Sequence, residues 1–303
     1  MNEKIRKVAV VGTGTLGTQI SILSAHFGYI VSTYDTSPES FKDGLKNLKN
    51  IMEIFKKKAL FSIKDIEEAA SSVLHCRELE EAVRDADVVI ESVPENLELK
   101  REIFEKLDSL APSRALLATN SSSLPISRIE GVMRRPERCL NIHFYSPATG
   151  TNMADIMGGT RTSAETIETA SSWVRSLGYV PLIVKKETLG FCFNRIWRAV
   201  KREALHLWAG GFVDFKDIDR GWMIAYGTPH GPFGMMDRVG LDVVYDIEMV
   251  YYNESKDPRD YPPEVLRAMV DRKELGIKTN KGFYRYPDPE YLRPDFLQAQ
   301  VTK

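Results

Sequence analysis

The feature that most constrains the fold of this chain is a glycine pattern close to its N-terminus. An apolar run, Lys7–Val11, leads directly into Gly12-Thr13-Gly14-Thr15-Leu16-Gly17, and a helical stretch follows. A second β-rich run, residues 30–34, ends at Asp35, which lies eighteen residues after Gly17. The pattern G-x-G-x-x-G is a weak signal alone, but here the strand, the helix and the acid that a dinucleotide-binding turn needs are all present. The sequence therefore predicts a strand–turn–helix unit that binds a dinucleotide.

The residues of this turn have separate physical roles. Gly12 permits the tight turn, Gly14 lets a pyrophosphate approach the backbone, and Gly17 lets the helix pack closely on the strand. The helix N-terminus supplies free N–H groups for the phosphates. The other predicted cofactor-binding positions of the turn are Thr13, Thr15 and Leu16. Asp35 would bind a ribose 2′-hydroxyl and repel a 2′-phosphate, which favours NAD over NADP. The plainer alternative is a glycine-rich turn in a nucleotide-free α/β protein, with a solvated aspartate.

The first half of the chain alternates β-rich runs with amphipathic stretches, as parallel βαβ units do. Further strands are predicted at residues 87–92, 115–119, 139–144 and 179–184. Between the second strand and these lie a long helix, whose apolar stripe runs from Phe41 to Phe55, and a second helix over about 63–70. We interpret these two helices as a hairpin inserted into a sheet domain.

Beyond Lys185-Lys186 the strand pattern ends, and residues 194–209 and 213–225 have the pattern of helices. The fold class predicted is α/β. It comprises a Rossmann-type doubly wound sheet with an inserted helical hairpin in residues 1–185, followed by an all-α domain in residues 186–303.

Composition excludes several classes of partner. Forty-one Lys and Arg against 42 Asp and Glu give a net charge of −1, which does not indicate nucleic acid or an anionic membrane. No apolar run approaches the roughly 18–20 residues of a membrane span, and no signal-peptide pattern is present. Three widely separated cysteines form neither a disulfide framework nor a zinc site. We expect a cytoplasmic, globular protein that binds a small molecule and no metal.

Polar residues gather at the carboxyl ends of the predicted strands, where open α/β sheets bind ligands. The strand at 87–92 ends in Glu91–Asn96, Asn120–Ser123 follow the strand at 115–119, and His143 lies within an otherwise apolar strand. Alcohol oxidation needs a base that titrates near neutral pH and hydrogen bonds to the oxygen, so His143 is a candidate catalytic residue. The plainer alternatives are a satisfied core histidine and, for the serines, a turn or a helix cap. A Ser-His-Asp hydrolase is not favoured because no G-x-S-x-G pattern exists. Spacing alone leaves open which acid partners His143.

Several further motifs occur in one order along the chain. They are Val93-Pro94-Glu95-Asn96-Leu97-Glu98-Leu99-Lys100, Asn120-Ser121-Ser122-Ser123, His143, Leu189-Gly190-Phe191-Cys192-Phe193-Asn194-Arg195, His230-Gly231-Pro232-Phe233-Gly234, Lys278-Thr279 and Gly282-Phe283-Tyr284. With the glycine turn, they make the chain resemble the 3-hydroxyacyl-CoA dehydrogenase family from about Val8 to Tyr286.

The resemblance implies a Rossmann domain and a helical domain that forms a dimer. It also implies that His143 is the acid/base, with Ser122 and Asn194 contacting the substrate oxygen. The residues that it would add to the NAD site are Glu95, Lys100, Ser122 and Lys278.

The chain departs from the family pattern at three of the positions compared and keeps a fourth. Ser146 stands where an asparagine is expected near the nicotinamide, and Asp155 stands where a glutamate partner of His143 is expected. In the hairpin, a CoA-contacting serine is replaced by Ile51, whereas a CoA-contacting lysine is retained near Lys58. The plainer alternative for the lysines at 56–58 is a solvated helix end. The overall likeness is closer to the diketoreductase branch, which acts on dicarbonyl esters.

The expected function is NAD-dependent interconversion of a 3-hydroxyacyl-CoA and a 3-ketoacyl-CoA, in fatty acid metabolism. The alternative enzyme is a ketoreductase or dehydrogenase of a non-CoA keto or hydroxy acid or ester. An alternative from another class is an NAD-binding structural or sensor protein with a decayed active site.

Overall fold

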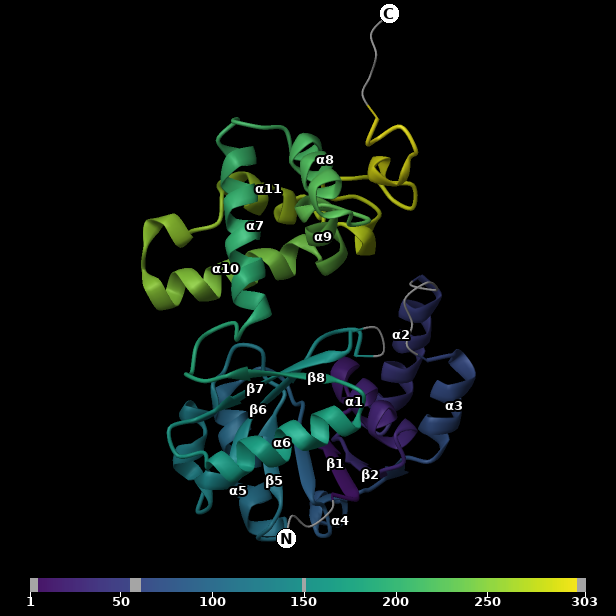
Figure 1. The fold of residues 1–303 in the computed structure, drawn as a ribbon, viewed down its shortest axis with the longest axis vertical. Coiled ribbons are helices and arrows are strands. Elements are labelled where there is room, and N and C mark those ends of the chain that lie inside the picture. The colour runs from purple at the N-terminus through teal and green to yellow at the C-terminus, as the bar shows by residue number, and fades with distance from the viewer. Residues whose placement is uncertain (1–4, 55–60, 149–150, 299–303) are drawn as a thin grey trace, which may run out of the picture. The chain divides into compact units, whose positions relative to one another are not determined.

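The computed structural model describes residues 5–54, 61–148 and 151–298. The chain divides into two compact units, residues 1–192 and 193–303 (Figure 1). The division falls between the last strand of the sheet, β8 (Val180–Val184), and the first helix of the second unit, α7 (Phe193–Ala209). The boundary predicted at residue 185 lies at the start of the same connecting segment.

The first unit is built on an eight-stranded sheet with the order β3-β2-β1-β4-β5-β6-β7-β8. The strands not yet given are β1 (Lys7–Val11), β2 (Ile30–Tyr34), β3 (Leu74–His75), β4 (Val88–Glu91), β5 (Leu116–Thr119), β6 (Cys139–Phe144) and β7 (Met153–Gly158). All neighbours are parallel except β6 and β7, which are antiparallel. The predicted doubly wound sheet is confirmed, and its order reverses at β1, the point at which such sheets bind ligands.

Two of the eight strands, β3 and β7, are not predicted from the sequence. β7 has the greater consequence because it pairs with β6 on one side and β8 on the other. Its antiparallel register with β6 places Asp155 opposite His143.

Helices cover both faces of the sheet (Figure 1). They are α1 (Thr15–His26) and α6 (Ala164–Ser176) on one face, and α4 (Leu79–Val83) and α5 (Leu97–Leu110) on the other. Trp173 of α6 and Phe104 of α5 are almost completely buried in these two layers. Because both faces are covered, β4 and β5 consist of buried residues only, as central parallel strands do.

The predicted helical hairpin is present as α2 (Ser40–Ile54) and α3 (Ile63–Ser71). Its apolar stripe packs against α1 through Leu48 and Ile66, which are buried. α3 begins with a capping box, in which Ser62 and Asp65 bond to each other's backbone N–H. Residues 55–60 lie outside the described residues, and with them the predicted substrate contact Lys58.

The second unit is helical, as predicted. Its remaining helices are α8 (Phe215–Tyr226), α9 (Pro232–Val239), α10 (Leu241–Ser255) and α11 (Glu264–Asp271). Its core includes Phe233 and Met236. Asp219 accepts hydrogen bonds from the backbone of Phe233 and Gly234, and thereby ties α8 to the start of α9.

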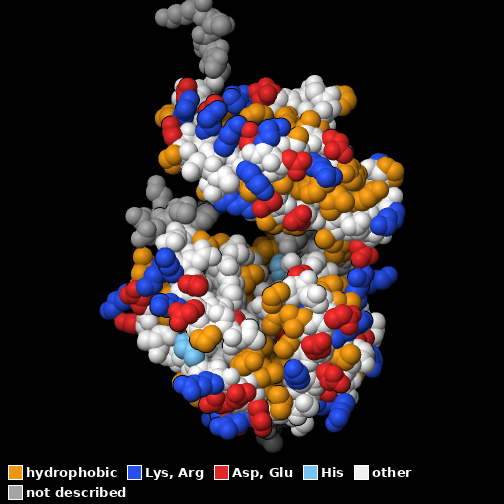
Figure 2. Space-filling model, turned by 180° about the vertical axis from the view of Figure 1, so that it is seen from behind, with side chains coloured by type: hydrophobic (Ala, Val, Ile, Leu, Met, Phe, Trp, Pro, Cys, Tyr) orange, Lys and Arg blue, Asp and Glu red, His pale blue; other side chains and the backbone are white. Residues whose placement is uncertain are grey.

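The exposed surface is of mixed charge. Figure 2 shows Lys and Arg side chains interspersed with Asp and Glu side chains on the face in view. Among the helices that the structure describes, none is both long enough and apolar enough to cross a membrane.

Candidate active site

The glycine turn joins β1 to α1 and leaves the start of that helix open. Gly12 has a φ of +91°, and a Cβ there would lie 2.6 Å from the carbonyl oxygen of Ser92. A Cβ on Gly17 would lie 1.8 Å from the carbonyl oxygen of Gly12. A Cβ on Gly14, by contrast, would meet nothing within 4 Å, so this side of the turn is open. Gly14 is also the N-cap of α1 and provides no side-chain cap, so the first N–H groups remain available to an anion.

Asp35 lies beside this turn, at the carboxyl end of β2. Its Oδ2 accepts hydrogen bonds from the Thr13 backbone N–H at 2.6 Å and from the Thr13 hydroxyl at 3.2 Å. Its Oδ1 accepts one from the Ser37 N–H at 2.8 Å. The carboxylate is therefore fixed next to the turn, and Oδ1 retains acceptor capacity. The open side at Gly14, the uncapped helix and this acid fit a dinucleotide with a free ribose hydroxyl.

An ion-pair cluster lies at the carboxyl ends of β4 and β5. The Lys100 ammonium, on α5, is 2.7 Å from Glu91 Oε1 and 3.3 Å from Glu95 Oε2. Glu91 and Lys100 have 0% and 1% of their side chains exposed, whereas Glu95 has 39% exposed. Glu91 also accepts hydrogen bonds from the Thr119 hydroxyl and the Val93 N–H, both at 2.7 Å. Lys100 is therefore a buried cation that links a core carboxylate to a half-exposed one.

The pKa values of the two carboxyl groups in the cluster are shifted in opposite directions. Burial raises the pKa of Glu91 above its ordinary value, in spite of the Lys100 charge. Burial would also raise the pKa of Glu95, but hydrogen bonds from Ser121 and Ser123 outweigh it and bring that pKa below its ordinary value. Glu95 is therefore a stable anion at the edge of the sheet.

The serine segment after β5 is anchored by Glu95 and by the neighbouring strand. Glu95 Oε1 accepts hydrogen bonds from the hydroxyls of Ser121 and Ser123. Asn120 Oδ1 accepts one from the Phe144 N–H at 2.9 Å, and so joins this segment to the end of β6. Ser122 lies between these anchored residues and is exposed.

The histidine lies on β6 and faces an acid on β7. His143 Nδ1 lies 3.3 Å from Asp155 Oδ2, and the two side chains are 6% and 0% exposed. The Tyr145 hydroxyl donates a hydrogen bond to the same Oδ2. The His143 ring is stacked on Phe191, with centroids 5.0 Å apart and planes at 4°, and meets the edge of Tyr145 at 4.6 Å. Such a histidine, oriented by a carboxylate and in contact with two aromatic rings, can carry a proton.

The other predicted site residues lie as follows. Ser146 follows β6 and is exposed, and the nearby backbone N–H of Ala148 donates to Gln19 Oε1 of α1 at 2.7 Å. Asn194 is the second residue of α7, and Lys278 forms an ion pair with Asp242, all within the second unit. The site roles predicted for Ser146, Asn194 and Lys278 stay predictions.

Three residues near the histidine or the cluster have no role predicted from the sequence: Glu91, Tyr145 and Phe191. A signal existed for Tyr145, since residues two apart along a strand share a face. Glu91 ends a predicted strand, but nothing in the sequence shows that it pairs with Lys100. The sequence contains no sign that Phe191 stacks on His143.

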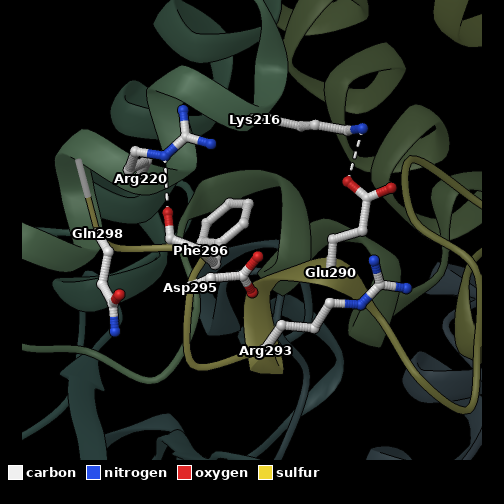
Figure 3. Close-up of a pocket in the computed structure, with 7 residues that line it drawn as sticks. All are labelled: Lys216, Arg220, Glu290, Arg293, Asp295, Phe296 and Gln298. Carbon is white, nitrogen blue, oxygen red and sulfur yellow. Dashed lines mark hydrogen bonds and ion pairs between the residues drawn. The ribbon is translucent and has the colours of Figure 1, made fainter. Parts of the chain in front are cut away.

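A hollow of about 530 Å³ lies in the second unit, between α8 and the C-terminal segment (Figure 3). Its lining residues are Lys216, Arg220, Glu290, Arg293, Asp295, Phe296 and Gln298. The Lys216 ammonium is paired with Glu290 at 2.6 Å, and Arg220 Nε donates to the Phe296 carbonyl at 2.8 Å. None of the lining residues is a predicted site residue. Over the described residues, no group of three His, Cys, Asp or Glu side chains could hold a metal ion.

Comparison with known proteins identifies similar chains over nearly the whole length. The family model for the 3-hydroxyacyl-CoA dehydrogenase NAD-binding domain matches residues 7–188, and the model for that family's C-terminal domain matches residues 190–286. A probable 3-hydroxybutyryl-CoA dehydrogenase of Bacillus subtilis is 31% identical over 285 residues, which cover 94% of this chain and 99% of that protein.

Two similar proteins act on other compounds. A 5-formyl-3-hydroxy-2-methylpyridine 4-carboxylate 5-dehydrogenase of Mesorhizobium japonicum is 28% identical, and the match covers 99% of this chain and 96% of that one. The solved structure of a diketoreductase, described as catalysing reactions of dicarbonyl compounds, is 34% identical with a TM-score of 0.82. That match covers 94% of this chain and 100% of the diketoreductase.

Proposed function

The chain belongs to the 3-hydroxyacyl-CoA dehydrogenase family, and from that premise we propose that it interconverts a 3-hydroxyacyl-CoA and a 3-ketoacyl-CoA with NAD(H). The observation that carries the proposal is the buried pair of His143 and Asp155, 3.3 Å apart, on β6 and β7 of the sheet whose strand β1 ends at the glycine turn. NAD, when bound, supplies the acceptor or donor of the hydride. In the oxidation, the hydride leaves substrate C3 while the hydroxyl proton passes to His143.

In this proposal Asp155 orients His143. A carboxylate has no proton to give, so His143 Nδ1 carries the hydrogen toward Asp155 Oδ2, and Nε2 is left without a proton to accept one from substrate. Ser122 and Asn194 donate hydrogen bonds to the substrate oxygen. The exposure of Ser122, between two anchored neighbours, supports a contact with a ligand.

The proposed cofactor residues act by binding and exclusion. The backbone of the glycine turn, from Gly12 to Gly17, binds the pyrophosphate, and Asp35 binds the ribose. Glu95, Ser122, Ser146 and Lys278 complete the site. Lys100 is 1% exposed, so we assign it an indirect role: it holds Glu95 in place through its ion pair.

The second candidate is a ketoreductase or dehydrogenase of a non-CoA keto or hydroxy acid or ester. It is favoured by the similarity to the diketoreductase and to the pyridine carboxylate dehydrogenase. Two residues support it as well, because Ile51 and Ser146 differ from the pattern of CoA-dependent relatives. If the substrate carries CoA, Lys58 is the proposed contact for it.

We further propose a cytoplasmic homodimer that functions in fatty acid metabolism, joined through the helical domain of residues 186–303. On α10, Val243, Ile247 and Val250 are 42%, 37% and 40% exposed, and their spacing of four and three places them in one stripe. Free thiols at all three cysteines accord with a reducing compartment. Light scattering of the purified protein tests the dimer.

A spectrophotometric screen of NADH oxidation tests the function. Acetoacetyl-CoA, free acetoacetate and ethyl acetoacetate are compared with the native chain and with His143→Ala. We expect turnover of acetoacetyl-CoA above the other two, and a loss of roughly 10²–10⁴-fold in kcat for His143→Ala with NADH binding retained. Preference for the free acid or ester would favour the second candidate. NADH binding without turnover of any substrate would indicate a decayed site.

A further inference from the structure

The two carboxylate oxygens of Asp155 differ in their hydrogen-bond partners. Its Oδ2 receives both His143 Nδ1, at 3.3 Å, and the Tyr145 hydroxyl, whereas its Oδ1 is buried and has no hydrogen-bond partner among the described residues. The side chain is 0% exposed, so bulk solvent does not reach it. One carboxylate oxygen thus carries all the recorded hydrogen bonds of the group.

The imidazole alone is a weak anchor for this carboxylate. Ordinary N–H···O bonds span about 2.7–3.2 Å, and the distance of 3.3 Å from His143 Nδ1 to Asp155 Oδ2 lies just beyond that range. An aspartate is also one methylene shorter than a glutamate, which would reach further across the strand pair. A carboxylate can turn about its Cβ–Cγ bond, because that torsion is broad. A second donor is therefore needed to keep Oδ2 toward His143.

Tyr145 is placed to provide that donor. It follows β6 and lies two residues after His143, so both side chains leave the backbone on one side. The edge of its ring meets the His143 ring, with centroids 4.6 Å apart and planes at 68°. Its hydroxyl reaches past the imidazole to Asp155 on the neighbouring strand. A hydrogen bond to an ionised, desolvated acceptor is stronger than one between neutral groups.

We propose that Tyr145 is a positioning residue: its phenol holds the Asp155 carboxylate in the orientation that faces His143 Nδ1. The Tyr145 hydroxyl thereby keeps the shorter aspartate directed at His143, as the extra methylene would do for a glutamate. Phe191, stacked on the His143 ring, keeps the plane of that ring fixed. The inference rests on the proposed function, since it needs His143 to carry the proton.

The proposal makes the two positions interdependent. Asp155→Glu would add a methylene within a side chain that is 0% exposed, and the longer carboxylate would move into the place of the Tyr145 hydroxyl. Removal of that hydroxyl makes room for the longer acid. We therefore expect Asp155→Glu and Tyr145→Phe to impair the enzyme singly, and the double variant to regain activity relative to both.

The experiment measures kcat and KM for the three variants with NADH and the β-keto substrate that the screen finds active, together with NADH binding by fluorescence. Tyr145→Phe should lower kcat about tenfold and leave KM and NADH binding within about twofold, since it removes one charge-assisted hydrogen bond and no substrate contact. Tyr29→Phe is the matched control: it removes the bond between the Tyr29 and Ser176 hydroxyls in the same unit, and should leave kcat unchanged.

Three outcomes would overturn the inference. They are an unchanged kcat for Tyr145→Phe, a rise in its KM alone, which would make Tyr145 a substrate contact, and a double variant no better than Asp155→Glu. If Tyr145→Phe does not fold, the double variant still tests the compensation, with circular dichroism as the check on folding. Full activity of His143→Ala would refute the proposed function instead, so the two failures are distinguishable.

Discussion

Replacing Lys100 by methionine would leave a carboxylate buried and unpaired in the core of the NAD-binding unit. Methionine has a similar length and no charge, so the substitution removes the ammonium and keeps most of the packing. The ammonium is 2.7 Å from Glu91, whose side chain is 0% exposed, and 3.3 Å from Glu95. Lys100→Met therefore isolates the electrostatic contribution of a single buried cation.

The magnitude follows from the distance and the burial. At 2.7 Å two unit charges attract by about 6 kcal/mol at an effective dielectric constant of about 20. Relaxation and the remaining hydrogen bonds to Glu91 reduce the net effect, and breaking one side of a buried pair costs about 3–5 kcal/mol. For a unit of this size, we expect the midpoint of thermal unfolding to fall by about 10 °C.

The loss of folding stability in Lys100→Met should depend on pH because Glu91 titrates. Burial raises the pKa of Glu91 in the folded state above its ordinary value of 4.5, and removal of Lys100 removes an opposing effect. A carboxyl group with a raised folded-state pKa stabilises the folded state while it is protonated. This contribution to stability is lost as the pH rises through that pKa. The difference between Lys100→Met and the native chain should therefore be larger at pH 7 than at pH 5, and should shrink as the pH falls toward 4.5.

Thermal and urea unfolding at pH 7 and pH 5 measure this difference. Lys7→Met is the matched control, since its ion pair with Asp85 at 3.1 Å is 43% and 64% exposed and is worth at most about 1 kcal/mol. Adding Glu91→Gln to Lys100→Met removes the unpaired charge and should recover more than half of the loss. The reasoning is refuted if Lys100→Met unfolds within about 1 kcal/mol of the native chain, or if Glu91→Gln adds to the damage.

Three further predictions concern the site and its thiols. If Asp35 binds the ribose, NADH should be preferred to NADPH at least about tenfold, and Asp35→Ala should narrow the gap mainly by weakening NADH binding; equal kcat/KM values of the native chain for both cofactors would contradict this. Asp155→Asn should lower kcat with the fold intact by circular dichroism, because the amide supplies no charge to stabilise an imidazolium; an unchanged kcat would make Asp155 a bystander. Burial raises the pKa of Cys139 to about 12, so iodoacetamide at pH 8 should label exposed Cys192 and leave Cys139 unmodified, as checked by peptide mass spectrometry; rapid labelling of Cys139 would show that the sheet opens.

The dinucleotide-binding half of this protein is readable from the sequence because its determinants are local. The spacing of Gly12, Gly14 and Gly17 depends on the backbone within one turn, and the flanking strand and helix each have an unambiguous pattern. The position of His143 within a strand and of Glu95 after one also follows from short-range patterns. Such signals predict where polar groups meet the edge of a parallel sheet.

The partnership of His143 and Asp155 is decided by tertiary structure. β7 is a six-residue segment, Met153–Gly158, with an acid in its middle and none of the alternation of a half-buried strand. It becomes a strand because β6 and β8 on either side satisfy its backbone hydrogen bonds. Its antiparallel register then places Asp155 opposite His143. The family resemblance predicts this partner, whereas the spacing of the residues leaves it open.

The same distinction explains why Tyr145 and the pair of Glu91 and Lys100 are visible only in the folded chain. Hydroxyl, carboxylate and ammonium groups are common on protein surfaces, and their sequence context does not tell whether water or another side chain satisfies them. Burial removes the water, and each group must then be paired by whatever the fold brings within hydrogen-bond distance. The sequence thus sets the chemistry available at the edge of the sheet, and the packing of the strands selects which groups act together.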